Sequence, residues 1–366
     1  MSKNLHEKPF DGTTIAKLEI FEDYAQAWIP TFVMHGDLVI CIFDFFAGTG
    51  YDKNGVPGSP IRVLKKLREQ IAPIFQKKVK VRVFFNEFNP KKQEQLSLAC
   101  NDFFKTYPEM GRAIELQIFN EDFDVCVDRL LPVIREFSSL IYLDQNGIRF
   151  LADKYLLELE KTTRTDFLYF VSSSYFWRFG DKEEFRTHVQ LDMGAAKKNP
   201  YHFIHRSLIN QLRTKLPVGS KLKLYPFSLK KGANIHGIIF GASHPRAVEK
   251  FLRIAWKRNE TNGEANFDID EDRQKRQLNL FEGRQLTKIE SFQQRLRNEV
   301  LKGSITNNFE AFDFALDEAH LGSHAAEELR KMKREALIDY QGISPLVTYE
   351  NVYQKGRRLT FKVIQK

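Results

Sequence analysis

The 366-residue sequence lacks any apolar run near the roughly 20 residues that a membrane-spanning helix requires. Its first ten residues, MSKNLHEKPF, lack the apolar core of a secretory signal. Cysteine is scarce, and Cys41, Cys100 and Cys126 form no CxxC pair, which argues against a disulfide scaffold or a cysteine zinc site. These absences predict a cytoplasmic protein with reduced thiols, no metal site and no membrane partner.

Positive charge is concentrated in one segment of the chain. The whole chain carries 56 Lys and Arg against 47 Asp and Glu, but residues 196–258 hold fourteen basic residues and a single acid, Glu249. Aromatic and histidine side chains interleave with them, which favours binding of a polyanion such as nucleic acid over a merely solvated surface. The residues that we expect to contact nucleic acid are Lys197, Lys198, Arg206, Lys221, Lys223, Lys230 and Lys231, together with Arg330, Lys331 and Arg334 of a later helix.

Apolar runs rich in β-formers alternate with helical patterns over the first 240 residues. The clearest run is LVICIFDFF, which is typical of a buried parallel strand. The alternation predicts an α/β fold, in which right-handed crossovers place helices on both faces of a parallel sheet. Strands are expected at Leu38–Phe46, Val79–Phe85, Ile114–Phe119, Ser139–Leu143, Asp166–Val171, Lys221–Tyr225 and Ile235–Phe240, and helices at Pro60–Phe75, Pro90–Thr106, Phe123–Arg135 and Leu151–Lys161.

The character of the sequence changes after residue 258, where we expect the α/β domain of residues 1–258 to end. Residues 259–284 begin with a polar, acidic stretch and are interpreted as a linker. Residues 285–366 predict a winged helix-turn-helix domain, because three helical patterns precede two short β-like pieces. Their net charge of +2 leaves both nucleic acid and protein open as its partner. The helices are expected at Thr287–Leu301, Phe309–Glu318 and Ser323–Ala336, and the β-like pieces at Leu346–Tyr349 and Leu359–Ile364.

A glycine loop, DFFAGTG, follows the first predicted strand. An acid, three intervening residues and then Gly-x-Gly match the first motif of class I methyltransferases. In that motif the glycines admit the methionine part of S-adenosylmethionine close to the backbone, and the acid lies near its ammonium group. The GxGxxG spacing of an NAD or FAD site is missing, and no GKS or GKT follows as a P-loop requires. We therefore expect Asp44, Phe46, Ala47, Gly48 and Gly50 to bind S-adenosylmethionine.

Acids also stand after the next three predicted strands, as Glu87, Asp122 and Asp144. Doubly wound sheets bind ligands at the carboxyl ends of their strands. Glu87 is expected to accept hydrogen bonds from ribose hydroxyls, and Asp122 from the adenine amino group, with Phe123 packed on the ring. Asp144 is the candidate catalytic residue, because a carboxylate near the methyl group can take a proton from the acceptor or orient it. The alternative is that these acids cap helices or shape loops.

The same residues resemble a known family. The loop DFFAGTG followed by GVPGSPIRVL (Gly55–Leu64) resembles the FAGxG…GSP signature of the three-Cys-motif partner (TcmP) proteins, which are predicted methyltransferases. Thr13–Pro30, with Lys17 and Trp28, resembles that family's helix before the first strand. YLDQNG resembles its fourth motif, and Ile235–Trp256 resembles its late strand and helix.

The resemblance covers nearly the whole chain, and it carries expectations of its own. It implies a Rossmann-like class I methyltransferase fold with a C-terminal winged helix and S-adenosylmethionine as cofactor. It also implies a protein partner, either a radical-SAM-like protein that carries three cysteines or another enzyme encoded in the same operon, and a role in a bacterial mobile-element or phage-defence system.

Two departures from related patterns narrow the chemistry. Gln145 stands where the family usually has proline, and no Asp/Asn-Pro-Pro-Tyr/Phe motif occurs, which argues against standard amino-directed DNA methylation. No cysteine follows a proline, which argues against attack on cytosine C5. Two other classes of function stay open. One is a non-catalytic module that binds the cofactor or a related nucleotide and regulates another enzyme, and the other is a DNA-binding adaptor with an α/β scaffold.

Overall fold

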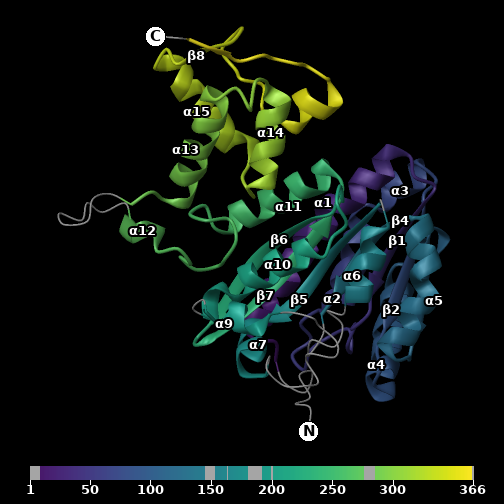
Figure 1. Cartoon of the computed structure of the whole chain (residues 1–366). Helices are drawn as coiled ribbons and strands as arrows, with labels where there is room; N and C mark the ends of the chain where they lie inside the picture. The colour runs from purple at the N-terminus through teal and green to yellow at the C-terminus, as the bar shows by residue number, and fades with distance from the viewer. Residues whose placement is uncertain are drawn as a thin grey trace. The chain divides into compact units, whose positions relative to one another are not determined.

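Seven strands form one sheet in the computed structural model, which describes residues 9–144, 153–162, 164–179, 192–198, 201–275 and 285–364 (Figure 1). Their order is β3-β2-β1-β4-β5-β7-β6. Strands β1 to β5 run parallel, whereas β7 is antiparallel to both β5 and β6, so the fold is Rossmann-like. The strands are β1 Val39–Asp44, β2 Lys80–Asn86, β3 Ile114–Phe119, β4 Ser138–Leu143, β5 Thr165–Ser172, β6 Lys223–Lys231 and β7 Asn234–Ala242.

The predicted strands are all present, and the largest difference is in β6. That strand was expected to end at Tyr225, before Pro226, but it continues to Lys231. An inner strand is hydrogen-bonded to a neighbour on each side, and proline has no N–H to donate to either. An edge strand has a neighbour on one side only and therefore tolerates proline. Because β6 is the last strand of the sheet, Pro226 pairs with Ile239 on one side only.

Helices cover both faces of the sheet. On one face, α5, α6 and α10 share an apolar core with β1, β4 and β5. On the other face, Phe21 of α1 stacks on Tyr142 of β4 with 4.0 Å between ring centroids. The helices of this part of the chain are α1 Gly12–His35, α2 Ser59–Glu69, α3 Ile71–Gln76, α4 Pro90–Thr106, α5 Phe123–Glu136, α6 Asp153–Glu160, α7 Ser173–Phe179, α9 Met193–Lys198 and α10 Ile204–Thr214, with short 3-10 turns at Pro108–Arg112 and Tyr201–Phe203.

The chain divides into two compact units, Met1–His244 and Pro245–Lys366. The sequence placed the boundary near residue 258, but the helix α11, Pro245–Arg258, groups with the C-terminal unit. Its Trp256 indole N–H donates to the Ala319 carbonyl at 3.0 Å. The described part of the expected linker, residues 259–275, is packed rather than extended, since Asn262 and Ala265 are fully buried.

Besides α11, the described part of the C-terminal unit contains one short helix, three longer helices and a minimal sheet. The short strands β8 and β9 pair antiparallel, and a single bridge joins Asn307 to Thr360. The expected strand at Leu346–Tyr349 is wrong, because β9 pairs with Ile338–Asp339 instead and a π-helical turn follows residue 349. The elements are α12 Asp272–Lys275, α13 Lys288–Leu301, α14 Asn308–Asp317, α15 Gly322–Arg334, β8 Ile338–Asp339, the π-helical turn Glu350–Gln354 and β9 Lys362–Val363.

One buried histidine, His320, and one half-buried histidine, His324, lie in the C-terminal unit. His320 stacks on Phe292, with 4.1 Å between ring centroids, and its Nδ1–H donates to the Glu318 carbonyl at 2.7 Å. His324 packs edge-on against Trp256 at 4.5 Å. Burial lowers the pKa of His320 to about 2 and that of His324 to about 4, and the nearby Lys288 ammonium adds to both effects.

We therefore predict that acid destabilises this unit. Both histidines are neutral in the fold but protonate near pH 6.5 once exposed, so unfolding takes up protons below that pH. Their contribution to stability is complete above about pH 6.5 and declines as the pH falls toward 4. Amide hydrogen exchange of α13–α15, corrected for intrinsic rates, should show weaker protection at low pH. The loss should shrink in a His320→Gln/His324→Gln variant, and pH-independent protection of the wild type would contradict the prediction.

Candidate functional site

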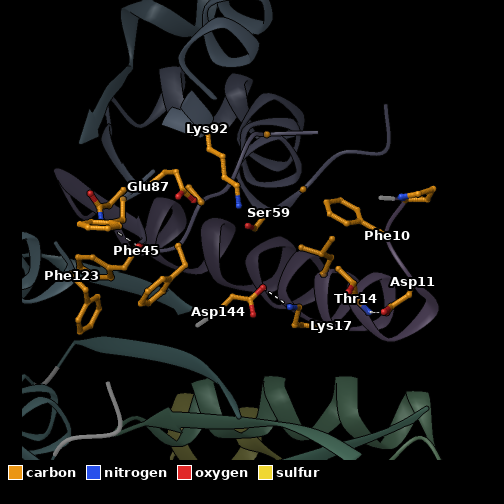
Figure 2. A pocket seen from close by; sticks show the side chains of 18 of the residues that line it. Phe10, Asp11, Thr14, Lys17, Phe45, Ser59, Glu87, Lys92, Phe123 and Asp144 are labelled. Carbon is orange, nitrogen blue, oxygen red and sulfur yellow. Dashed lines mark hydrogen bonds and ion pairs between the residues drawn. The ribbon is translucent and has the colours of Figure 1, made fainter. Parts of the chain in front are cut away.

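A cavity of about 690 Å³ lies at the carboxyl edge of the sheet. The loop after β1, the tips of β2, β3 and β4, and the start of α1 form its walls (Figure 2). Three of the four acids expected at strand tips, Glu87, Asp122 and Asp144, line it. The other residues predicted to bind the cofactor that line it are Phe46, Ala47, Gly50 and Phe123, and Lys231 from the predicted nucleic-acid set lines it as well.

The glycine loop needs its glycines for conformation and for space. Gly48 and Gly50 have left-handed backbones, with φ of +66° and +86°. A Cβ on Gly50 would lie 3.0 Å from the Cβ of Ala99 in α4. The carbonyl of Gly50 accepts the amide of Gly58 at 2.8 Å, which ties the loop to the residues that precede α2.

Asp44 lies behind the cavity wall rather than in it. Its carboxylate accepts the Ser59 hydroxyl at 2.6 Å and the Phe46 amide at 3.1 Å, and the residue is only 1 % exposed. Burial raises its pKa to about 7, and the charges of Asp144 and Glu87 act in the same direction. In this structure Asp44 therefore shapes the loop, while Ser59, which it orients, lines the cavity.

Glu87 joins the tips of β1 and β2. Its carboxylate accepts the Gly48 amide at 3.1 Å and the Asn89 amide at 2.9 Å, so Gly48 contacts the site through Glu87 although it does not line the cavity itself. The preceding Asn86 bonds the Glu121 amide and carbonyl, both at 3.1 Å, and thereby fixes the tip of β3 beside that of β2.

Aromatic rings surround the Asp122 end of the cavity. Phe46 and Phe123 stack with 5.2 Å between ring centroids, and Tyr155 meets Phe123 edge-on at 5.1 Å. The Asp122 carboxylate accepts the Asp124 amide at 3.1 Å and thus caps α5, which is the alternative role predicted for these acids. Asp122 also lines the cavity. Sequence reasoning missed Phe88, which follows Glu87 and is 70 % exposed in the cavity wall.

Asp144 pairs with a lysine from the first helix. The Lys17 ammonium lies 2.5 Å from the Asp144 carboxylate and 4.2 Å from the centre of the Phe170 ring. Both partners line the cavity, as Figure 2 shows. The sequence offered Lys17 only through family resemblance, because the partners are far apart in the chain. Gln145 and the loop that follows, residues 145–152, lie outside the described residues.

The residues predicted to contact nucleic acid do not form one patch. The nine residues of β6 span about 27 Å, so Lys221 and Lys223, at the start of this strand, lie far from Lys230 and Lys231 at its end. Lys231 lines the cavity and pairs with Asp11 at 2.8 Å. Lys197, Lys198 and Arg206 belong to α9 and α10, and Arg330, Lys331 and Arg334 are exposed on α15 of the C-terminal unit.

Arg206 lies at the cavity edge of the sheet. The neighbouring residue His205 contacts Ser173 and the Val171 carbonyl at the end of β5, which places the start of α10 there. Burial lowers the pKa of His205 to about 4, and the ring fills the space beside Gly237, where a Cβ would lie 1.9 Å from its Nε2. His205 is therefore a neutral packing residue.

Cysteine nucleophiles and metal clusters do not contribute to this site in the described residues. Cys41, Cys100 and Cys126 are buried and unpaired with one another, and burial raises the pKa of each thiol to about 12. Within the same residues, no three His, Cys, Asp or Glu side chains gather as a metal site. Among the helices described, none combines the length and apolar character that crossing a bilayer requires.

No protein-family model and no curated protein matches the chain. Among solved structures, a candidate class I S-adenosylmethionine-dependent methyltransferase from Listeria monocytogenes matches with 11 % identity, a TM-score of 0.31 and coverage of 67 % of this chain and 63 % of that one. The DszA carbon methyltransferase matches with 14 % identity, a TM-score of 0.29 and coverage of 59 % and 50 %. This chain thus spans less than two thirds of either structure.

The glycine loop yields a test with an internal control. Gly50→Ala should lower the free energy of unfolding by more than Gly55→Ala, measured by urea denaturation. Both substitutions place alanine in a left-handed backbone, which costs about 1–2 kcal/mol. A Cβ at Gly55 meets nothing within 4 Å, whereas one at Gly50 meets Ala99. Equal losses would show that α4 does not press on the loop.

Proposed function

We propose that the N-terminal unit is an S-adenosylmethionine-dependent methyltransferase. The observation that carries the proposal is the hydrogen bond from the Gly48 amide to Glu87, which joins a glycine loop after β1 to an acid after β2 in the wall of one cavity. The sheet is Rossmann-like, and such sheets bind ligands at the carboxyl ends of their strands, where this cavity lies. The cavity volume lies within the roughly 300–1,000 Å³ of small-molecule sites.

The chemistry of the lining residues suits the cofactor from end to end. Glu87 offers two carboxylate oxygens to the ribose hydroxyls, and Asp122 offers an acceptor to the adenine amino group. Phe88 and Phe123 supply flat apolar surface for the adenine ring. The methionine end lies along the glycine loop, where Ala47 and Gly50 line the cavity.

Alignment is the main task of the residues around the reacting atoms. When bound, S-adenosylmethionine supplies a methyl group that its sulfonium has already activated. Asp144 orients the acceptor and takes up the proton that the acceptor loses when the new bond forms. Lys17 fixes the position of that carboxylate through their ion pair, and the Phe170 ring supports the lysine.

We further propose nucleic acid, or a partner bound to it, as the methyl acceptor. Arg206, Lys230 and Lys231 lie at the cavity edge of the sheet, which supports an anionic acceptor there. In the C-terminal unit, three helices, the β8–β9 pair and the bridge from Asn307 to Thr360 support a winged helix that presents basic residues of α15. Membership of the TcmP proteins, their three-cysteine partner and a defence role rest on the motif resemblance alone.

Calorimetry with S-adenosylhomocysteine tests cofactor binding. We expect Glu87→Gln to weaken binding at least tenfold, because a charged acceptor of ribose hydroxyls becomes neutral. Glu94→Gln provides a matched control, since Glu94 is exposed on α4 outside the cavity. Equal affinities for the wild type and Glu87→Gln, with the fold intact by circular dichroism, would refute the assignment of Glu87.

Transfer of radiolabelled methyl to total nucleic acid separates an enzyme from a binding module. Asp144→Asn should lower the transfer rate about 10²- to 10⁴-fold while changing the S-adenosylhomocysteine affinity little. Asp122→Asn, in the same cavity, should mainly weaken cofactor binding. Tight binding by the wild type with no transfer to nucleic acid or to cell lysate would favour the non-catalytic alternative.

A further inference from the structure

Within the described part of the chain, one lysine of the cavity wall has no counter-ion. Among the described residues that line the cavity, Lys17 pairs with Asp144 and Lys231 pairs with Asp11. Lys92 lines the same cavity, yet no hydrogen bond or ion pair engages its ammonium group. A half-buried cation without an anionic partner makes the space in front of it favourable for an anionic group of a ligand.

The helix α4 places this lysine above the glycine loop. Leu96 and Ala99 lie on the face of α4 that meets Gly50, since both are within 3.6 Å of where a Gly50 Cβ would be. Lys92 precedes them by four and seven residues and therefore lies on the same face, one turn nearer the cavity. Figure 2 shows its side chain extending into the cavity toward Ser59.

The surroundings of Lys92 add positive potential. Gly58 and Ser59 line the cavity at the N-terminus of α2, and no side chain caps that end of the helix. The dipole of this 11-residue helix therefore points its positive end toward the space that Lys92 enters. The Asp44 carboxylate behind Ser59 already accepts hydrogen bonds from the Ser59 hydroxyl and the Phe46 amide.

We propose that Lys92 binds the carboxylate of the amino-acid end of the cofactor. This inference rests on the proposed function, in which Glu87 and Asp122 hold the adenosyl end. The glycine loop beneath Lys92 holds the methionine end, and its carboxylate is the anionic group that S-adenosylmethionine and S-adenosylhomocysteine share. Lys92 then makes the site selective for these ligands over adenosyl thioethers that lack the amino-acid portion.

Calorimetry with two ligands tests this selectivity. S-adenosylhomocysteine carries the carboxylate, whereas 5′-methylthioadenosine keeps the adenosyl thioether without it. We expect Lys92→Met to weaken S-adenosylhomocysteine binding about tenfold or more and to leave 5′-methylthioadenosine binding unchanged. Lys91→Met, which removes the same charge from an exposed neighbour outside the cavity, should change neither affinity.

The remaining outcomes separate this proposal from the proposed function. Unchanged S-adenosylhomocysteine affinity in Lys92→Met, or an equal loss for both ligands, would overturn the role of Lys92 while leaving the cofactor site standing. A loss confined to nucleic-acid binding would assign Lys92 to an acceptor phosphate and likewise overturn it. If the wild type binds neither ligand, the proposed function fails, and the role of Lys92 fails with it.

Discussion

Hydrogen bonds to a buried carboxylate, Asp44, hold the loop on which the site depends. Asp44 ends β1 beneath the glycine loop and is bonded by Phe46 within the loop and by Ser59 at the start of α2. A carboxylate this deeply buried is unfavourable unless donors satisfy it, and its raised pKa reflects that cost. The turn that these bonds stabilise lets the Gly48 amide face Glu87 on the neighbouring strand.

The parallel sheet then gathers the remaining chemistry. Strands β1 to β4 end together, so Glu87, Asp122 and Asp144, which are 22 to 57 residues apart in sequence, line one cavity. The start of α1 contributes another part of the cavity wall. There Asp11 caps the helix and pairs with Lys231, while Lys17 pairs with Asp144. The Phe10 amide donates to Asp52 at 2.7 Å, which ties the chain before α1 to the loop after the glycines.

Much of this arrangement follows from the sequence, because buried strands are continuous apolar runs and their ends are marked by polar residues. Glu87, Asp122 and Asp144 were predictable as cavity residues, since parallel strands must end together. The role of Asp44 was not predictable, because its hydrogen-bond partner Ser59 stands fifteen residues later, at the start of α2. The prediction of a strand at Leu346–Tyr349 was wrong because strands of two residues are too short to show alternating hydrophobicity. The partner of β9 is instead β8, with Ile338 opposite Val363.

Contacts between side chains that are far apart in sequence could not be predicted from the pattern of residues along the chain. The basic residues in and near β6 are close in sequence, yet they lie at the two ends of a strand about 27 Å long. Lys92 follows another lysine, Lys91, in the sequence. Only the packing of α4 over Gly50 shows that Lys92, and not Lys91, lines the cavity. Charge counted along the chain therefore identified a basic protein but did not identify the cation that enters the cavity.

The most direct test of the central claim is a crystal structure determined with S-adenosylhomocysteine. The account predicts ligand density between the glycine loop and Asp122, with the ribose against Glu87 and the adenine beside Phe123. A cavity that stays empty at saturating ligand, or a ligand bound elsewhere on the unit, would contradict it.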